Sequence, residues 1–584
     1  MKILILDSGV YTAHPAFRNG TIDGYGLVYD EQEDCCIRVA DLEDQIGHGT
    51  AVYDLIRKNC TCADIRMVKI FEEALELSEE ALVAALSYIQ EHEKPDLLNL
   101  SLGITNCTNV AALYEVCRKI REQGTVILSA FSNDGAISYP AAFDCVYGVT
   151  GAANMTQVQD LGYVPDSYVN LCAKGTVSRL AWKEPNYVFL AGNSFSCAMA
   201  TAALAARLHE GSIHLEKLPI GVEHMEVSGR LPFAIERAAI FPFNKEMHSL
   251  ARFPQLLSFE IVDIFDHRYS GHVNASVRKM LNAENALDRT IRDISDIEWD
   301  KVDTLILGHI EELARLTKDP ELGTRLIAAA REHGVKVYAF DPGEKEEGVF
   351  RMEITARNLP TNHYGKLFRI SKPVLGIWGT SSRQGKFTLQ LIIRELFQKA
   401  GYQVGQLGTE PTSLLFGMDE VFPYGYNSGI RLTEAEALLY INRLMNNICL
   451  SDCDIIIAGA QSAAVSYGIG NLEQFIPYQH AFLCGTAPDA IVLMVSPHDS
   501  VEYISNTIRY VEAVSEGKVI ALCLFPKRIE ASAAGFYENY KSLSEEELKG
   551  HRQYLQETLG VNTWVLGREE DMKELVDTII DYFG

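Results

Sequence analysis

The 584-residue sequence contains no run of about 18 or more uncharged apolar residues, so it predicts no transmembrane helix. At the N-terminus only four apolar residues separate Lys2 from Asp7, and the apolar segment and cleavage site of a signal peptide are missing. Internal repeats and low-complexity tracts are absent as well. We therefore expect a cytoplasmic protein with no membrane partner.

Basic residues are few compared with acidic ones. The chain has 52 Lys and Arg against 78 Asp and Glu, which gives a formal net charge of -26 at pH 7. A field of that sign repels a phosphate backbone, so nucleic acid is not expected as a partner. Two interpretations stay open, a solubilising surface or attraction of a basic peptide substrate. The oligomeric state is not predicted by these features.

Cysteine pairs of the C-x-x-C kind, which bind zinc or do redox chemistry, are absent. The thirteen cysteines are an odd number, which argues against a complete disulfide framework. Cys35 with Cys36, and Cys60 with Cys62, are too close in sequence for a metal site. We predict free, mostly structural thiols in a reducing compartment.

The chain is too long for one hydrophobic core, because single cores stop growing at about 250 to 300 residues. Strand-like and helix-like runs alternate over most of its length, which is typical of parallel sheets with crossover helices. The pattern predicts an α/β protein with four parts. These are a first α/β domain over residues 1–211, a linker or small subdomain over 212–255, a Rossmann-like domain with connector over 256–372, and another α/β domain over 373–584.

Three motifs place a carboxylate, an imidazole and a hydroxyl at predicted strand ends and helix starts. Asp7 follows the first strand in the run Ile-Leu-Asp-Ser-Gly, and open parallel sheets gather functional groups at that end. His48 opens a helix in Gly-His-Gly-Thr; taken alone, such a histidine is more often a helix-entry residue than a base. Ser194 enters a small-residue helix in Gly-Asn-Ser-Phe-Ser-Cys-Ala-Met, whose N-terminus offers backbone N–H groups to an oxyanion.

In this order the three motifs resemble those of the subtilisin-like serine proteases, which read D-S/T-G, H-G-T and G-T-S-M/F-A. The resemblance implies a subtilisin-like parallel sheet with flanking helices. It also implies a catalytic triad in which His48 is the general base for Ser194 and Asp7 orients the imidazole. No cofactor is expected for proteolysis.

The resemblance continues between the motifs. Residues 96–103 look like the family's substrate-binding strand, which implies that Ser101, Leu102 and Gly103 pair with an extended peptide. Residues 126–141 look like the segment that carries the family's oxyanion asparagine, which maps that role onto Asn133.

The sequence departs from the family pattern in the serine motif and in the short length of the domain. We expect trimmed loops where the family shapes subsites or binds calcium. The acidic run at residues 30–34 fits calcium or a basic substrate, but a solvated loop is the commoner interpretation. The first strand starts at residue 1, which predicts no inhibitory propeptide, so narrow specificity or another domain would restrain the protease.

A second constellation lies at residues 376–388, where a strand, a glycine-bearing loop and a helix start follow one another. Backbone N–H groups in such a loop cradle phosphate, and Lys386 meets its charge. The match to G-x-x-x-x-G-K-[ST] is imperfect. Five residues separate Gly379 from Gly385, and the hydroxyl of Thr388 comes one place late. The run is similar to the P-loop of dethiobiotin-synthetase-like proteins.

Residues 372–525, with the Rossmann-like unit before them, resemble a poorly characterised family of P-loop proteins. The resemblance implies that Gly379, Gly385, Lys386 and Thr388 bind ATP or another nucleotide, with Thr388 on magnesium. Ala458 stands where the family has an acidic residue. Binding without fast turnover and a degenerate scaffold therefore both stay open.

Together the resemblances imply an intracellular serine endopeptidase acting on one peptide or protein precursor, for example a ribosomally made peptide during maturation. The P-loop half would regulate the protease or recruit its substrate. Two alternatives remain. The P-loop half is the main enzyme, an ATP-dependent ligase or kinase-like transferase, or the chain is a binding protein with two residual sites.

Overall fold

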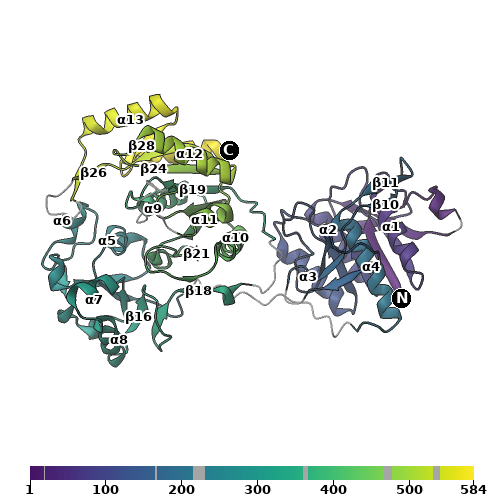
Figure 1. The fold of residues 1–584 in the computed structure, drawn as a ribbon, viewed down its shortest axis with the longest axis horizontal. Helices are drawn as coiled ribbons and strands as arrows, with labels where there is room; N and C mark the ends of the chain where they lie inside the picture. Colours follow the sequence, from purple (N-terminus) through teal and green to yellow (C-terminus); the bar gives the residue numbers. More distant parts are fainter. Residues whose placement is uncertain (19, 165–166, 215–230, 360–365, 466–476, 531–538) are drawn as a thin grey trace. The chain divides into compact units, whose positions relative to one another are not determined.

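The computed structural model describes residues 1–584 except 19, 165–166, 215–230, 360–365, 466–476 and 531–538. The chain divides into two units (Figure 1). The N-terminal unit comprises Met1–Met225 and Pro360–Ser371, and the C-terminal unit comprises Glu226–Leu359 and Lys372–Gly584. The chain therefore returns to the N-terminal unit for one short segment.

The N-terminal unit is built on a nine-stranded sheet with the strand order β3-β2-β4-β1-β5-β6-β7-β9-β8. The pairs inside the sheet are parallel, and only the two edge strands, β3 and β8, pair antiparallel. The strands are β1 (Lys2–Asp7), β2 (Asp23–Asp30), β3 (Cys35–Val39), β4 (Asp64–Lys69), β5 (Leu97–Leu100), β6 (Val126–Ala130), β7 (Tyr147–Ala152), β8 (Leu161–Tyr163) and β9 (Leu171–Lys174). A separate hairpin pairs β10 (Ser178–Ala181) with β11 (Tyr187–Leu190).

Helices cover both faces of this sheet, which explains why β1 reads as an unbroken apolar run. Ile3 and Ile5 pack in one core with helices α1 (His48–Asn59) and α4 (Asn193–His209). Leu4 and Leu6 pack in a second core with α2 (Glu79–His92) and α3 (Val110–Glu122). A 3-10 turn, η1 (Pro15–Phe17), completes the unit.

The C-terminal unit contains two further sheets. The six-stranded sheet has the order β14-β13-β12-β15-β16-β17, and the seven-stranded sheet has the order β21-β20-β23-β19-β24-β25-β28; all their pairs are parallel. The shorter pairs β18-β22 and β26-β27 lie outside them. The predicted α/β class, with a Rossmann-like part and a P-loop part, is confirmed.

The six-stranded sheet and its helices comprise β12 (Arg237–Phe241), β13 (Glu260–Asp266), β14 (Arg292–Asp293), β15 (Thr304–Leu307), β16 (Lys336–Ala339), β17 (Val349–Arg351), α5 (His248–Arg252), α6 (Val277–Leu281), α7 (Glu311–Thr317) and α8 (Leu322–Glu332). Short 3-10 turns join them at η3 (Pro254–Leu256), η4 (Arg268–Ser270), η5 (Ile294–Asp296), η6 (Trp299–Lys301) and η7 (Ala356–Asn358).

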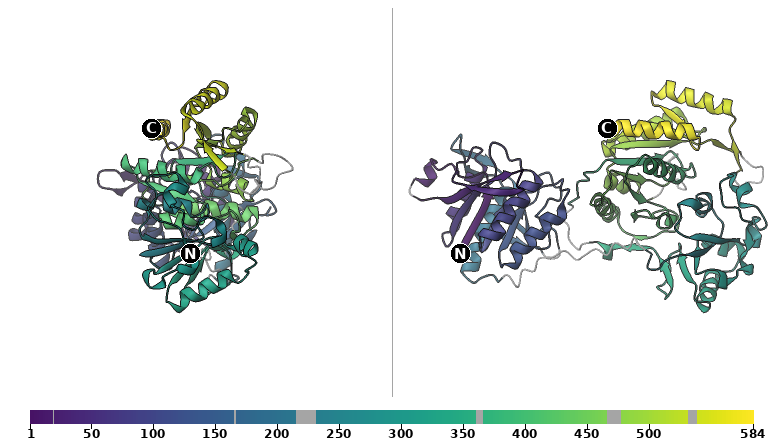
Figure 2. Two further views of the ribbon diagram at one scale, coloured as in Figure 1. Left: turned by 90° about the vertical axis from the view of Figure 1, so that its left-hand side faces the viewer. Right: turned by 180° about the vertical axis from the view of Figure 1, so that it is seen from behind.

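The remaining strands are β18 (Glu353–Thr355), β19 (Val374–Gly379), β20 (Val404–Gly408), β21 (Glu420–Val421), β22 (Gly429–Arg431), β23 (Ile455–Gly459), β24 (Ala490–Val495), β25 (Lys518–Leu524), β26 (Lys527–Glu530), β27 (Asn539–Ser542) and β28 (Thr563–Val565). The remaining helices are α9 (Lys386–Lys399), α10 (Glu434–Cys449), α11 (Gln479–Thr486), α12 (Val501–Ser515), α13 (Glu545–Leu559) and α14 (Glu569–Phe583), with the 3-10 turn η8 (Pro411–Phe416). Helix α14, the yellow helix that ends at the C-terminus in Figure 2, packs in one core with α9.

Two segments differ from the predicted boundaries. Residues 212–255 were expected to form a linker or small subdomain, but β12 within them lies inside the six-stranded sheet, between β13 and β15. This strand is short, begins with Arg237, contains two alanines and is followed by Pro242, so it lacks the β-branched run that marks a buried strand. Residues 366–371, expected in the Rossmann-like connector, belong to the N-terminal unit.

All thirteen cysteines are free thiols, and most are buried, which agrees with the structural role predicted for them. Among the described residues, no helix is both long and apolar enough to cross a membrane.

Candidate active site

Asp7 and His48 meet at the carboxyl end of β1. Asp7 is the last residue of that strand and is 1% exposed, and His48 is the first residue of α1 and is 7% exposed. His48 Nδ1 lies 2.8 Å from Asp7 Oδ1, and the same carboxylate oxygen accepts the backbone N–H of Ser8 at 2.8 Å. This hydrogen bond orients the imidazole and leaves Nε2 available as a base.

A second acidic residue, Asp44, shapes the turn before His48. Its Oδ1 accepts the backbone N–H of Ile46 at 2.9 Å and of Gly47 at 2.8 Å. Its Oδ2 accepts the backbone N–H of Thr50 at 2.9 Å and the Thr50 hydroxyl at 2.6 Å. Asp44 is fully buried, and sequence reasoning missed it, because nothing in the local pattern marks it as a helix-start support.

Gly47 is required by this turn. Its φ is 104°, in the left-handed region, and a Cβ at this position would lie 2.7 Å from Trp182 Nε1. The glycine that precedes His48 thus lets the chain turn tightly into α1, close against Trp182.

The environment of His48 raises its pKa above the usual 6.5. Burial lowers the pKa, but the Asp7 charge and hydrogen bond raise it by more, and Asp44 adds to the rise. Asp7 therefore stabilises the imidazolium, as a triad aspartate does when the base takes up a proton.

Ser194 lies in the first turn of α4, beside these two residues. The ring of Phe195, the next residue, has its centroid 5.3 Å from that of His48. The Ser194 carbonyl accepts the Ser101 hydroxyl at 2.9 Å. Within the described part of the chain no hydrogen bond joins Ser194 Oγ to His48, and such bonds are often long before substrate binds.

Asn133 lies in the loop after β6 and contacts the first residue of α4. Its Oδ1 accepts the backbone N–H of Asn193 at 2.8 Å, so its amide is held one residue away from Ser194. With Oδ1 engaged, Nδ2 is the group left to donate to an oxyanion.

Asn193 explains the departure from the family's serine motif. Its Nδ2 donates to the carbonyls of Phe131 and Ser132 at 3.0 and 3.1 Å, and its Oδ1 accepts the backbone N–H of Gly151 at 2.9 Å. The asparagine thus fastens the helix start to the strand end that leads to Asn133. Sequence reasoning treated it only as a mismatch.

The predicted substrate strand follows β5 directly. Besides the Ser194 carbonyl, the Ser101 hydroxyl contacts Asn99 Oδ1 at 3.0 Å, and the Leu102 carbonyl accepts the Ser129 hydroxyl at 3.1 Å. Gly103 is exposed, and a Cβ there would lie 2.9 Å from Ser138 Oγ. The structure therefore brings all three residues to the end of the sheet where Ser194 lies.

The acidic run at residues 30–34 lies in the turn between β2 and β3 and is largely exposed. Asp30 Oδ1 accepts the backbone N–H of Gln32 at 2.9 Å, and Asp34 accepts the Tyr29 hydroxyl at 2.7 Å. Across the described residues, no group of three or more His, Cys, Asp or Glu side chains is arranged to hold a metal ion.

In the C-terminal unit, β19, a loop and α9 follow one another, which is the strand, loop and helix start expected for residues 376–388. Gly385 has φ 83° and immediately precedes the helix. Lys386 is buried, and its Nζ donates to the Ser381 carbonyl at 2.6 Å across the loop. A Cβ on Gly379 would lie 2.9 Å from Gln384 Oε1 and 3.2 Å from Lys386 Nζ. These features fit a phosphate cradle, while Thr388 lies partly buried in the first turn of α9.

Asp499 also holds this loop, although the sequence did not identify it. Its Oδ2 accepts the Thr380 hydroxyl at 2.5 Å and the backbone N–H of Ser496 at 2.6 Å. Gln384 Nε2 in turn donates to Thr380 Oγ1 at 2.7 Å. Asp499 follows β24, which pairs with β19, so the loop is supported from the neighbouring strand.

Glu410 brings a carboxylate towards Lys386. It follows β20, which pairs with β23, the strand that carries Ala458. A carboxylate is therefore present after the strand next to β23. Desolvation raises the pKa of Glu410 to about 7, and Glu246 adds to the rise, whereas Lys245, Lys386 and His309 oppose it. Burial lowers the pKa of Lys386 to about 8 against the charges of Glu410 and Asp499.

A second His–Asp pair lies at the ends of β15 and β16. His309 Nδ1 is 2.7 Å from Asp341 Oδ1, which also accepts Asn427 Nδ2 at 2.6 Å. Asp341 Oδ2 accepts the backbone N–H of Ile310 at 2.8 Å. Both oxygens of the Asp341 carboxylate thus accept hydrogen bonds, from residues 309 and 310 and from Asn427.

The two sheets of the C-terminal unit meet beside Glu410. The hydroxyl of Tyr338, on β16, donates to the carbonyl of Pro411 at 2.7 Å. The Phe340 ring stands between Tyr338, at 5.1 Å, and His309, at 5.8 Å. His309 and Glu410 therefore lie at one junction.

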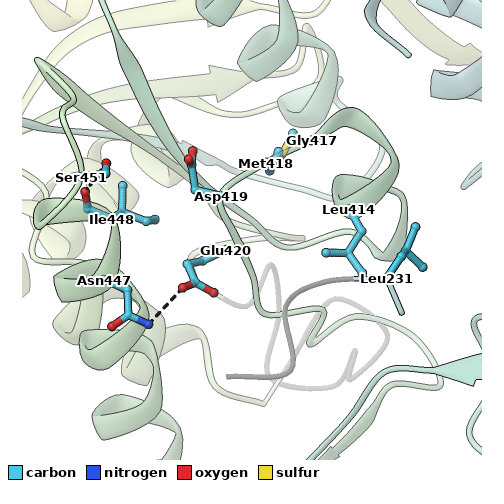
Figure 3. Close-up of a pocket in the computed structure, with 9 residues that line it drawn as sticks. All are labelled: Leu231, Leu414, Gly417, Met418, Asp419, Glu420, Asn447, Ile448 and Ser451. Carbon is cyan, nitrogen blue, oxygen red and sulfur yellow. Dashed lines mark hydrogen bonds between the residues drawn. The ribbon is translucent and has the colours of Figure 1, made fainter. Parts of the chain in front are cut away.

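A separate cavity of about 450 Å³ lies beside η8, β21 and the end of α10 (Figure 3). Its walls include Asp419 and Glu420, but Gln406 N–H and Asn447 Nδ2 already donate to these carboxylates at 2.8 and 3.0 Å. None of the proposed triad or phosphate-binding residues lines it.

The sequence matches two family profiles. Residues 1–212 match the Subtilase family, and residues 362–576 match a domain of unknown function described as the DUF1611_C P-loop domain. The chain carries a subtilase domain and a DUF1611 P-loop domain.

Three known proteins illustrate the similarity. The major intracellular serine protease of Bacillus subtilis is 25% identical over 224 residues, which cover 35% of this chain and 67% of that protein. A crystal structure of a DUF1611 family protein from Anabaena variabilis is 15% identical and covers 59% of this chain and 99% of that one, with a TM-score of 0.44. The epidermin leader peptide processing protease of Staphylococcus aureus is 17% identical and covers 38% and 66%, with a TM-score of 0.30.

The chain spans 38% and 35% of the length of two further curated relatives. The subtilase match and the protease relatives support serine endopeptidase activity for the N-terminal domain. They do not assign a substrate.

Proposed function

We propose that the subtilase domain is a serine endopeptidase that works through Asp7, His48 and Ser194. The observation that carries this proposal is the buried hydrogen bond between His48 Nδ1 and Asp7 Oδ1, at 2.8 Å, beside the helix start that presents Ser194. A buried carboxylate and imidazole are costly to desolvate unless they are paired. Their pairing at a strand end, next to a partly buried serine, supports a catalytic use.

The proposed mechanism uses only side chains and backbone of this domain. His48 Nε2 takes the proton of Ser194 Oγ as the oxygen attacks the scissile carbonyl, and Asp7 stabilises the resulting imidazolium. Asn133 Nδ2 and the Ser194 backbone N–H hold the developing oxyanion. The imidazolium then protonates the leaving amine, and water, deprotonated by His48, releases the acyl group from Ser194.

We propose a specific peptide or protein precursor as the substrate, in the cytoplasm. One structural relative processes a leader peptide, and the formal net charge of -26 favours approach of basic peptides. A peptide library cleaved with no enrichment of basic residues would remove the charge argument.

Labelling with a serine-directed fluorophosphonate tests the proposed protease. We expect the probe to modify residue 194 in the intact protein, because His48 activates that hydroxyl. Ser101 and Ser196 serve as internal references, since each donates its hydroxyl hydrogen to nearby oxygens. The label is located by tandem mass spectrometry. Folded protein that stays unlabelled, or that is labelled equally at the reference serines, would contradict the proposal.

A second candidate function belongs to the C-terminal unit. We infer that Gly379, Gly385 and Lys386 bind the phosphates of ATP or another nucleotide, with Thr388 as the proposed magnesium ligand. The bound nucleotide would supply a transferable phosphoryl group, as in a ligase or kinase-like transferase. The observation that favours this candidate is the hydrogen bond from His309 Nδ1 to Asp341 Oδ1, at 2.7 Å, which orients an imidazole near Glu410.

Replacing Lys386 by Ala is expected to weaken binding of ATP with magnesium by roughly ten- to a hundredfold, the loss of one hydrogen bond from a charged donor. Isothermal titration calorimetry on the full-length protein measures the effect. Lys399→Ala is the matched control, because that lysine is at the far end of the same helix with its side chain 67% exposed. Equal affinities of wild type and Lys386→Ala, or no binding to the wild type, would remove nucleotide binding from the proposal.

A further inference from the structure

Sequence similarity places residues 366–371 in the C-terminal domain, whereas their contacts in the structure place them in the N-terminal unit. They fall inside the segment that matches the P-loop domain, residues 362–576, and outside the subtilase match, residues 1–212. In the structure they belong to the segment Pro360–Ser371 of the N-terminal unit, while the chain up to Leu359 and from Lys372 onwards belongs to the C-terminal unit. The C-terminal half therefore supplies a piece of the protease unit.

The segment is inserted in the protease core by its apolar side chains. Phe368 is 8% exposed and packs in the same core as Phe131, Ile137 and Tyr139, and its ring lies 5.9 Å from that of Tyr168. The partly buried Ile370 packs against that core as well. These contacts are of the kind that stabilise a domain interior.

Polar contacts tie the segment to the loop that carries Asn133. The Leu367 carbonyl accepts the backbone N–H of Ile137 at 2.7 Å. Lys366 is buried, with its Nζ 4.9 Å from the centre of the Phe131 ring. The segment thus holds the loop on both sides of Asn133, at residue 131 and at residue 137.

The same loop is joined to the start of α4. Asn193 Nδ2 donates to the carbonyls of Phe131 and Ser132, and the Asn193 backbone N–H donates to Asn133 Oδ1. Ser194 is the next residue. A continuous set of contacts therefore leads from Phe368 and Leu367, through the loop of residues 131–137, to the helix start that carries Ser194.

We propose that residues 366–371 are positioning residues of the protease, which hold Asn133 where it donates to the oxyanion. The proposal rests on the proposed protease function. In this role the segment acts on the oxyanion through Asn133. Because only Lys372 and Pro373 separate it from β19, the protease is joined through this segment directly to the strand that leads into the phosphate-binding loop.

Phe368→Ala in the full-length protein is expected to lower kcat for a peptide substrate by roughly ten- to a hundredfold, because small displacements of a catalytic donor are costly. KM is expected to stay within about twofold, since the oxyanion forms only after binding. Ile37→Ala is the matched control. Ile37 is an apolar residue of the same unit, on the edge strand β3 and outside the segment, and it is 51% exposed.

A double-mutant cycle with Asn133→Ala separates positioning from general loss of structure. If the segment acts through Asn133, Phe368→Ala costs less than about twofold in the Asn133→Ala background. An undiminished loss in that background, or unchanged kcat in the single variant, would overturn the proposal. Should Phe368→Ala fail to fold by circular dichroism, Phe368→Leu, which keeps apolar contact, is carried through the same cycle.

The two failures are distinguishable. Absence of peptide cleavage and of fluorophosphonate labelling in the wild type would remove the protease itself, and the positioning role with it. Labelled, active wild type with a Phe368 effect independent of Asn133 would remove the positioning role alone.

Discussion

Ser194→Ala is expected to lower kcat for peptide hydrolysis by about a millionfold, which is the loss that removal of a triad nucleophile causes. The physical reason is that no other hydroxyl takes its place. Among the serines of the same region, Ser101 and Ser196 donate to oxygens of Asn99, Lys174, Gly192 or Ser194. Progress curves at high enzyme concentration measure the residual rate.

Ser196→Ala is the matched control for Ser194→Ala. Ser196 lies two residues further along α4 and is buried, so its replacement reports on the helix rather than on the chemistry. We expect a loss of stability of about 1 kcal/mol from its hydrogen bonds and a kcat within about tenfold of wild type. A Ser194→Ala protein that retains wild-type kcat would show that hydrolysis arises elsewhere in the chain.

Asp7→Asn is expected to lower kcat by about ten-thousandfold with little change in fold, because an amide does not hold His48 in the base tautomer. The pH profile should change as well. Asp7 raises the pKa of His48 above 6.5. The neutral base therefore forms only as the pH rises through that raised pKa, and kcat/KM increases over the same pH range. Without the carboxylate, the pKa of His48 falls and the inflection moves to lower pH.

The control for Asp7→Asn is Asp54→Asn, on the same helix as His48. Asp54 is buried but pairs with Arg57 and Lys58 at 3.3 and 3.1 Å, so its loss leaves the imidazole unaffected. Rates of peptide cleavage between about pH 5 and pH 9 measure both variants. An inflection that stays at the wild-type pH in Asp7→Asn would mean that His48 is not the titrating base.

Both halves of this chain place a His–Asp pair at the carboxyl end of a parallel sheet. In each, a histidine at the carboxyl end of a sheet bonds through Nδ1 to a carboxylate, at 2.8 Å for His48 and at 2.7 Å for His309. Parallel strands bring their carboxyl ends together, so polar groups that follow different strands converge there. This convergence explains why polar residues far apart in the sequence lie together at these strand ends.

Residues that follow strands directly were open to prediction from sequence. Asp7 follows an apolar run, His48 follows a glycine, and Gly379 to Lys386 follow another apolar run, so local pattern places each at an element end. The fold class followed from the alternation of strand-like and helix-like runs. Strand β12 was missed because its alanines and the proline that follows it carry no strand signal.

By itself the sequence determined the α/β class and the local positions of the residues proposed for the triad and for phosphate binding, because these depend on short-range pattern. Only the tertiary structure decided which residues support them. Asn193, Asp499 and Glu410 act on neighbours from other elements, and the contacts of residues 366–371 with residues 131–137 span more than 200 positions. Contacts between distant segments exist only once the chain has closed on itself, and no periodicity or motif along the sequence records them.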